Sequence, residues 1–436
     1  MIKAVMPVTL ALLATTSQAF AQGPLHVDIT DGTASPLLIA IPEVASGVIP
    51  GVANGEDAGE ALARIVRADM SSTGLYRLVS IDGRYSGSEE VAFAPFARAG
   101  AQALVLGRAR PSGNDALAYD CVLYDVFGAR IETSQRILVS KAQWRRAAHK
   151  CADMVFAFTT GDQGHFDTRL LVIGQAGSAP GQGTSLLSMD FDGENRTSLT
   201  EERELVAMPR FGPGSRRIIY TSFTGPGPKL VLDDLDSGES RTLDLPKGVP
   251  SAPRFSPDGA SVIFSLARDG EADIHVIDLS SGAVRQLTSN AGADTSPSYS
   301  PDGTSIAFES DRSGEPQVYV MASDGSGQKR ISFGAGAHGS PTWSPRGDLI
   351  AFTKIENRTL RIGVMKPDGS RERIITEGGR DEDPAWAISG RAIAFQRTAG
   401  GEALPAVWIT DLTGKLARQV KVGSSVGEPA WSGKRP

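Results

Sequence analysis

A motif of proline, any residue and an aromatic side chain recurs through the second half of the chain, at steps of 43 to 45 residues. Its copies begin at Pro209, Pro253, Pro297, Pro341, Pro384 and Pro429. A glycine in a short turn repeats with the same period, at Gly193, Gly238, Gly282, Gly325, Gly369 and Gly414. Two markers in phase indicate a structural repeat. A period of about 40 to 45 residues with several short strands per unit is typical of β-propeller blades.

The residues after the proline motif support strands rather than helices. Two copies continue with Ser-Pro-Asp-Gly, at residues 256–259 and 300–303. This suits a type I β-turn, because Pro presets φ and the final Gly accepts a positive φ. Apolar residues then alternate with period two, as in Ile306 and Phe308, which is the period of a strand. Helical solenoids of similar period would need helical apolar spacing, which these units lack.

The two ends of the array complement each other. The first unit starts near Arg169 and has no Pro-x-aromatic strand, whereas the last motif, at Pro429, has no further strands after it. Joined, they make one blade. We therefore expect six blades over residues 165–436, closed by the C-terminal strand so that no sheet edge is exposed.

The region before the repeats has a different pattern of apolar residues. Ala58, Leu62, Ile65, Val66 and Met70 share one helical face, a second helical stripe runs from 144 to 158, and strand-like runs lie between them. Residues 35–164 are therefore predicted to form a small α/β domain, with two helices on a mixed sheet. The predicted fold class is multidomain: this α/β domain followed by an all-β propeller.

The first 21 residues have the features of a secretory signal peptide. Lys3 gives a positive start, residues 4–14 are largely apolar, and Ala19-Phe20-Ala21 suits cleavage before Gln22. We expect an exported, periplasmic protein. No later apolar run reaches the roughly 20 residues needed to span a bilayer. The net charge of −6, with its 44 basic residues spread along the chain, argues against nucleic acid as the main partner.

The expected export bears on whether the two cysteines form a disulfide. Cys121 lies on the inward face of a strand-like run and Cys151 on the helical stripe with Trp144, Ala148 and Val155. A disulfide between them is compatible with an oxidising compartment. Two buried free thiols are the alternative, since the sequence does not supply their separation.

The whole mature chain resembles the TolB family of the Tol-Pal system. The resemblance is carried by the architecture, by HVDITDG followed by PLLIAIPEV, and by HKCADMVFAFTTGDQGHFDTRLLVIG at the entry to the repeats. It implies a non-enzymatic periplasmic adaptor, monomeric and without cofactors. Such an adaptor would bind the lipoprotein Pal at one propeller mouth and TolA through its N-terminal segment. Other outer-membrane proteins are further candidate partners. The implied role is maintenance of the outer membrane and its constriction during division.

The resemblance also points to particular residues. Ala252 and Thr295, just before repeat prolines, match the Pal-facing loops, and His338 is a further candidate at the same mouth. Related sequences often have a His where this chain has Val249, which removes one polar contact. The TolA-binding role falls on residues 22–34, through Leu25, His26, Val27, Asp28, Ile29 and Thr30. We also expect this segment to couple the two binding events if it can either dock or be free.

Three motifs invite other interpretations. Gly423–Gly427 fits G-x-S-x-G, but no His follows Ser425. Residues 334–339 fit G-x-G-x-x-G, but a repeat proline and a strand follow at once. The acidic runs 190–193 and 381–383 lack the ligand spacing of a Ca²⁺ loop and are interpreted as solvated turns.

The sequence predicts no metal site, because the spacing of the candidate ligands is not that of a metal centre. These candidates are His149, His165, Cys121 and Cys151. The alternative functions are an exported ligand- or glycan-binding propeller and, with less support, an exported hydrolase.

Overall fold

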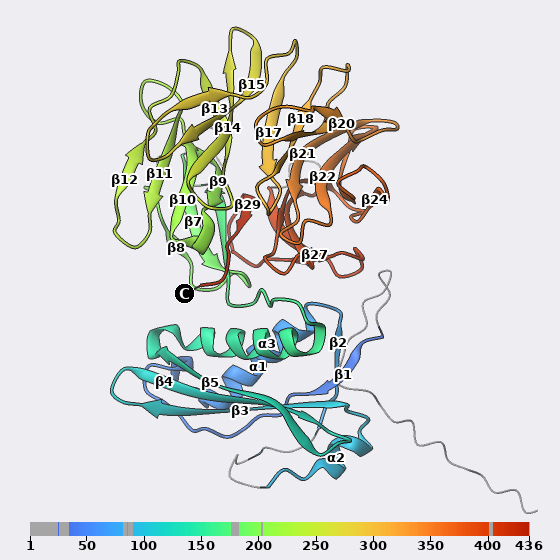
Figure 1. Ribbon diagram of the computed structural model, residues 1–436. Helices are drawn as coiled ribbons and strands as arrows, with labels where there is room; N and C mark the ends of the chain where they lie inside the picture. Colours follow the sequence, from blue (N-terminus) through green and yellow to red (C-terminus); the bar gives the residue numbers. More distant parts are fainter. Residues whose placement is uncertain are drawn as a thin grey trace, which may run out of the picture.

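A computed structural model describes residues 25, 35–81, 85, 90–175, 183–201, 204–400 and 404–435. Within them the chain forms a small α/β domain and a β-propeller (Figure 1). The expected signal peptide, and His26 to Thr30 of the expected TolA-binding segment, lie outside the described residues. No described helix has the length and apolar character to cross a bilayer.

The first domain is built on a five-stranded mixed sheet with the strand order β2-β1-β3-β4-β5. Strand β1 is parallel to β2 and β3, whereas β3, β4 and β5 are antiparallel neighbours. The strands are β1 Leu37–Ala40, β2 Tyr76–Leu78, β3 Ala103–Ser112, β4 Ala116–Asp125 and β5 Arg130–Ser140.

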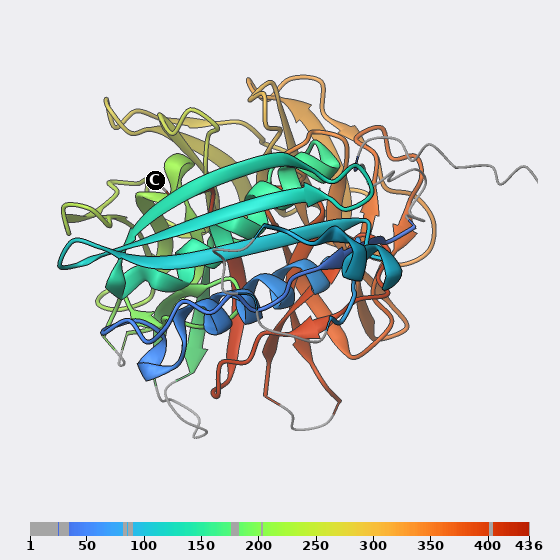
Figure 2. The same ribbon diagram turned by 90° about the horizontal axis from the view of Figure 1, so that it is seen from below.

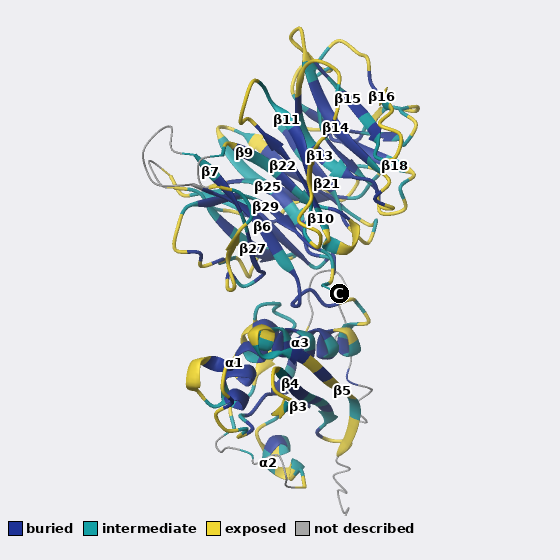
Figure 3. Ribbon diagram, turned by 90° about the vertical axis from the view of Figure 1, so that its left-hand side faces the viewer, coloured by how far each residue is buried: buried dark blue, intermediate teal, exposed yellow. Residues whose placement is uncertain are grey.

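Two long helices, α1 (Ala58–Ser71) and α3 (Trp144–Thr160), pack on one face of this sheet, and both were expected. Helix α1 begins where the Asp57 carboxylate accepts hydrogen bonds from the backbone N–H groups of Gly59 and Glu60. Helix α3 ends at Gly161, whose φ of 73° is the left-handed conformation that glycine tolerates. A short helix that the sequence did not reveal, α2 (Phe93–Arg98), lies on the other face. Helices α1 and α3 lie between the sheet and the propeller (Figure 3).

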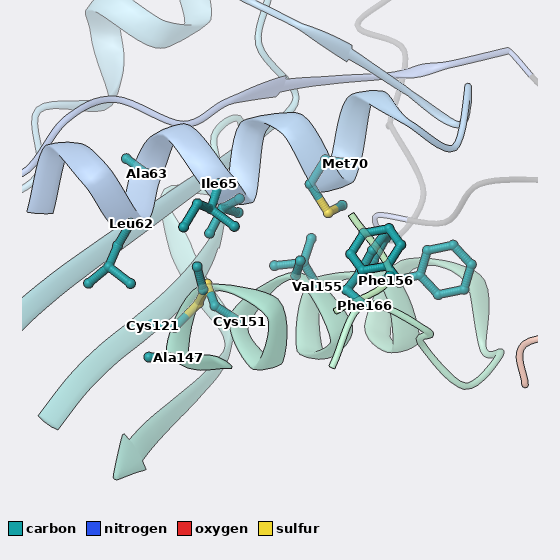
Figure 4. Packing of buried hydrophobic residues seen from close by; sticks show 14 of the residues in the cluster. Leu62, Ala63, Ile65, Met70, Cys121, Ala147, Cys151, Val155, Phe156 and Phe166 are labelled. Atoms are coloured by element: carbon teal, nitrogen blue, oxygen red, sulfur yellow. A yellow bond between two sulfur atoms is a disulfide. The ribbon is translucent and has the colours of Figure 1, made fainter. Parts of the chain in front are cut away.

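A disulfide joins Cys121 of β4 to Cys151 of α3, with a Cα–Cα distance of 5.8 Å. This is the first of the two alternatives that the sequence left open. The bond lies among fully buried apolar residues, including Leu62 of α1 and Val155 of α3 (Figure 4). It fixes α3 to the sheet at the centre of the domain core.

The propeller is assembled from antiparallel sheets of four strands. These sheets are β9-β12, β13-β16, β17-β20 and β29-β6-β7-β8, while β21 to β28 form an eight-stranded sheet in which two antiparallel sets are joined by one parallel bridge, Leu360 to Arg380. The bounds of the first strands are β6 Arg169–Gln175, β7 Thr184–Asp190, β8 Thr197–Ser198, β9 Val206–Phe211, β10 Arg217–Ser222, β11 Lys229–Asp234, β12 Ser240–Thr242, β13 Val249–Phe255, β14 Ser261–Arg268, β15 Glu271–Asp278 and β16 Val284–Gln286. The others are β17 Asp294–Tyr299, β18 Ser305–Ser310, β19 Gln317–Ala322, β20 Lys329–Arg330, β21 Ala337–Trp343, β22 Ile350–Glu356, β23 Thr359–Met365, β24 Arg373–Ile374, β25 Arg380–Trp386, β26 Ala392–Thr398, β27 Ala406–Asp411, β28 Arg418–Gln419 and β29 Val426–Trp431.

The strands that carry the repeat prolines form the inner wall of the ring. Strands β9, β13, β17, β21, β25 and β29 each contact the next one in this order, and β29 contacts β9. The C-terminal strand β29 pairs with β6, as expected, so that residues from the two ends of the repeat array complete one sheet. The Trp431 indole N–H, in β29, donates to the Thr168 hydroxyl at 2.8 Å.

The Ser-Pro-Asp-Gly turns have the predicted geometry. The N–H of Gly259 donates to the Ser256 carbonyl, and that of Gly303 to the Ser300 carbonyl, both at 2.9 Å. Gly259 has a φ of 70°. These turns follow the inner strands and lie on the face of the propeller nearer the first domain, since Asp162 of the linker after α3 pairs with Arg346 of the equivalent turn.

Candidate partner-binding surfaces of the propeller

The residue before each repeat proline adopts a positive φ, between 47° and 56°. These residues are Met208, Ala252, Ser296, Ser340, Asp383 and Glu428. Each lies where the pairing of the inner strand with the next strand shifts register. A β-bulge turns side chains out of the regular alternation, and a positive φ at a residue other than glycine persists only where the surroundings impose it. The inner wall of the ring is therefore made of repeated strained positions.

Ala252 and Thr295, the residues expected to face Pal, lie on neighbouring inner strands β13 and β17. Both are half-buried. The Ala252 N–H is 3.1 Å from the Met208 sulfur of the preceding inner strand. Val249, at the start of β13, has 44% of its surface exposed, so this strand presents an apolar side chain beside Ala252. Ala252 thus lies in the bulge of β13 and Thr295 near the start of β17, both on the side of the repeat proline away from the Ser-Pro-Asp-Gly turn.

The expectation that His338 lines an open mouth is wrong. Its side chain is fully buried at the start of β21. The Nε2 atom is 2.9 Å from the Lys354 Nζ and 3.2 Å from a Glu372 carboxylate oxygen, and the ring lies 5.1 Å from the Phe352 ring. Burial lowers the pKa of His338. The residue packs inside the blade and does not line an open mouth.

Sequence reasoning did not identify the carboxylates that gather around the inner wall. Glu309 of β18 accepts a hydrogen bond from the Ser340 N–H of β21 at 2.9 Å. Glu428 of β29 accepts one from the Met208 N–H of β9 and so links two neighbouring inner strands. Glu382 accepts from the Gln396 amide at 2.9 Å. Burial raises the pKa of Glu309, Glu382 and Glu428, and the negative charge of Asp383 raises it further. Glu382, Asp383 and Glu428 lie one or two positions before a repeat proline. Aligning the repeats at their prolines would therefore have revealed these three acidic residues.

Two aspartates expected in solvated turns are buried, which corrects the sequence interpretation. Asp190, 2% exposed, accepts a hydrogen bond from the Asn195 amide at 2.7 Å and pairs with Arg435 near the C-terminus. Asp381, fully buried, forms a two-fold ion pair with Arg397 at 2.6 and 2.8 Å. Their ion-pair partners lie 16 or more residues away, so local turn composition did not reveal them.

His149 of α3 lies at the junction between the two domains. Its Nδ1 is 2.7 Å from the Asp69 carboxylate of α1, and its Nε2 is 3.8 Å from that of Asp192, in the turn after β7. Burial alone would lower the pKa of His149, but the charges of Asp69, Asp192 and Asp190 outweigh it and raise the pKa to about 9. A positive imidazolium therefore joins carboxylates of both domains.

His149, Asp190 and Asp192 lie close enough together to offer three ligand atoms to a metal ion. However, Arg145 pairs with Asp192 and Arg435 pairs with Asp190. These guanidinium groups already supply the positive charge that the carboxylates attract. The arrangement is that of an ion-pair network between domains.

The enzyme-like motifs lie in the context of propeller strands. Ser425 directly precedes strand β29, and its hydroxyl donates to the Pro405 carbonyl at 3.2 Å. A nucleophile elbow would require a helix there. The glycine-rich run 334–339 leads into strand β21, whereas dinucleotide binding would require a helix N-terminus at this point. Of the N-terminal segment, Leu25 is described and is buried in the core of the first domain.

A small α/β domain joined to a ring of antiparallel sheets defines the class of protein: a β-propeller with an N-terminal accessory domain. Two family models match the chain, the TolB amino-terminal domain over residues 25–131 and the TolB β-propeller domain over residues 156–435. The chain belongs to the TolB family.

Relatives and a solved structure agree with this assignment. The chain is 41% identical over 210 residues to the Tol-Pal system protein TolB of Rhizorhabdus wittichii, which is 47% of this chain and 48% of that protein. It is 40% identical over 226 residues to the one of Cereibacter sphaeroides, which is 50% of each. The chain thus spans about half the length of the curated relatives it matches. The crystal structure of TolB from Acinetobacter baumannii superposes with a TM-score of 0.78 at 25% identity, covering 93% of this chain and 99% of that one.

Proposed function

We propose that the protein is a non-enzymatic periplasmic adaptor of the Tol-Pal system. It binds Pal at the propeller mouth formed by the starts of the inner strands, and TolA through residues 22–34 after cleavage before Gln22. The observation that carries this proposal is the match of both domains, in order, to the two TolB family models. The role that follows is maintenance of the outer membrane and its constriction during division.

The proposed architecture has domain limits at residues 35–164 and 165–436 and a ring of six blades. The blade count is supported by the chain of contacts among the inner strands, and it treats the eight-stranded sheet as two blades joined by a single bridge. A closed ring gives the partner one rigid mouth. A rigid mouth reduces the entropy that binding must overcome.

The proposed Pal contact is centred on Ala252 and Thr295. Half-buried residues held by bulges on adjacent inner strands present a fixed surface, with the exposed Val249 side chain beside it. The carboxylates of Glu382, Asp383 and Glu428 give this mouth a negative potential. Such a potential favours a partner surface with basic groups and accelerates its association.

The test is calorimetric titration of the mature chain with the periplasmic domain of Pal from the same organism. We expect one-to-one binding that Thr295→Arg abolishes, because the longer charged side chain would occupy the mouth. Thr242→Arg, on the exposed outermost strand β12, is the matched control and should bind as the unchanged protein does. Equal loss in both variants, or no binding at all, would contradict the proposed contact.

The coupling between the two partners can be measured in the same series. Deletion of residues 22–34 should abolish TolA binding and change the affinity for Pal. By thermodynamic linkage, if TolA binding changes the affinity for Pal by some factor, Pal binding changes the affinity for TolA by the same factor. An unchanged Pal affinity would remove the coupling and leave the adaptor role standing.

A further inference from the structure

The inner wall of the propeller differs from one repeat to another at a single position. At the position directly after the repeat proline, two neighbouring repeats carry arginine, Arg210 and Arg254, and the other repeats carry small residues. Those small residues are Ser298, Thr342, Ala385 and Ala430. Two long basic side chains on one side and short side chains around the rest leave open space within the ring.

That space is a cavity of about 440 Å³, lined by both arginines and by all four of the small residues. The turn residues Pro257, Pro301 and Pro345 also line it, so it lies at the ends of the inner strands near the Ser-Pro-Asp-Gly turns. Every lining residue comes from the range 210–433, and none belongs to the first domain. The volume is within the range of about 300–1,000 Å³ that is usual for small-ligand sites.

The two guanidinium groups lack acidic partners within the part of the chain that the structure describes. Arg210 donates one hydrogen bond, to the Pro209 carbonyl at 2.7 Å, and no described carboxylate lies within ion-pair distance of Arg210 or Arg254. The acidic groups that act on them at longer range are Asp383, on both arginines, and Glu428, on Arg210. Burial lowers the pKa of both arginines, and the charge of Arg210 lowers that of Arg254 further. Two like charges so confined are destabilising unless an anion lies between them.

The walls around the arginines are aromatic, and most of their polar groups are already engaged. The indole N–H groups of Trp386 and Trp431 donate to Thr342 and Thr168, at 2.9 and 2.8 Å. The Ser298 hydroxyl oxygen accepts a hydrogen bond from the backbone N–H of Trp343 at 3.0 Å. No described residue accepts a hydrogen bond from the Ser298 hydroxyl. The cavity therefore combines two guanidinium donors and a hydroxyl donor with apolar sides.

We propose that this cavity binds a small anion, whose carboxylate or phosphate group is held by Arg210 and Arg254 and whose body packs against the aromatic walls. Guanidinium groups bind both kinds of oxyanion through paired, charge-assisted hydrogen bonds. The lining of this cavity includes neither Ala252 nor Thr295, although Arg254 is two residues after Ala252 on β13. The anion site therefore has to be tested separately from the partner contacts proposed above.

The test uses the full mature chain and two probes, citrate and inorganic phosphate, in calorimetric titrations at constant ionic strength. We expect at least one of them to bind to the unchanged protein. Arg254→Ser, which copies the residue of the next repeat, should weaken that binding at least about tenfold, since one paired guanidinium contact is lost. Binding of citrate alone assigns the site to organic acids, and binding of phosphate alone to phosphate esters.

The control variant is Arg268→Ser, which removes the same charge from an exposed position at the end of β14. It should bind the probes as the unchanged protein does. Equal affinity in Arg254→Ser and the unchanged protein, or no binding of either probe, would overturn the proposal. Circular dichroism of Arg254→Ser without anion should show a folded chain. Its Pal affinity should be unchanged, so failure here is distinguishable from failure of the adaptor role.

Discussion

The first domain and the propeller are both built on β-sheets, but their sheets are stabilised in different ways. The first domain, which lies across one face of the propeller (Figure 2), has an open sheet that ends at β2 and β5, is covered on one face by two helices and is fixed at its centre by a disulfide. The propeller repeats one sheet around an axis and joins its ends through the pairing of β29 with β6, supported by the packing of Trp431 and without a covalent bond. The difference shows that a short open sheet needs a local constraint, while a ring needs one correct closure.

The largest effect is expected at the closure of the ring. Trp431 of β29 is 9% exposed, its ring contacts His165 and Phe191, and its N–H is bonded to Thr168. Trp431→Ala should lower the free energy of unfolding of the propeller by about 3–5 kcal/mol, the usual cost of truncating a large buried aromatic residue. Denaturant unfolding followed by fluorescence would measure it.

Trp408→Ala, half-buried on β27 away from the closure, is the matched control. It should cost less, because more of its ring is in contact with water. If the two variants lost equal stability, the junction between the ends of the ring would not be the critical contact that the comparison implies.

The next effect concerns the disulfide of the first domain. Its cysteines are 30 residues apart, so Cys121→Ser with Cys151→Ser should lower the stability of this domain by about 3–4 kcal/mol. The cause is the greater conformational freedom of the unfolded chain. The propeller transition should not move. Two unfolding transitions, recorded with and without reductant for the unchanged protein, would separate the domains.

A smaller effect is expected at the junction, where His149 is charged. Its pKa of about 9 in the folded protein lies above the ordinary value of 6.5, so the stabilisation is complete below about pH 6.5 and is lost as the pH rises through 9. The loss should be on the order of 1–3 kcal/mol. The groups that face His149 are Asp69, Asp190 and Asp192, together with Arg145 and Arg418.

His149→Phe should remove this dependence between pH 6.5 and 9 while keeping the contact with Phe191. His165 provides the internal comparison. Burial lowers its pKa to about 3, so it is neutral throughout that range and cannot cause the change. An unchanged profile in His149→Phe, measured as thermal midpoint against pH, would show that His149 does not carry the charge that links the two domains.

Much of the fold could be predicted because the signals are local and repeated. The spacing of the prolines, the Ser-Pro-Asp-Gly turns and the alternation after them each follow from a few neighbouring residues. The strand expected from the alternation of Ile306 and Phe308 is β18, and both side chains are fully buried. The buried faces of α1 and α3 were predicted in the same way, from one helical period. Helix α2 was not, since six residues give too short a pattern.

The sites were less predictable, because they are made by residues far apart in the sequence. His338 was expected at a mouth and is buried against Lys354, while Asp190 was expected in water and is paired with Arg435. Neither partner is visible in a local pattern. The arginine cavity was also missed, although Arg210 and Arg254 stand at one repeat position where the other repeats have small residues.

The sequence by itself determined the period, the strand order within a repeat, the turn geometry and the need for the last strand to join the first unit. Each of these depends on residues that are neighbours along the chain or on a constant spacing. The tertiary structure decided which side chains face the inside of the ring, because closure brings positions of successive repeats together across one axis. It also decided the charge of His149, since the carboxylates that hold its proton come from α1 and from the turn after β7.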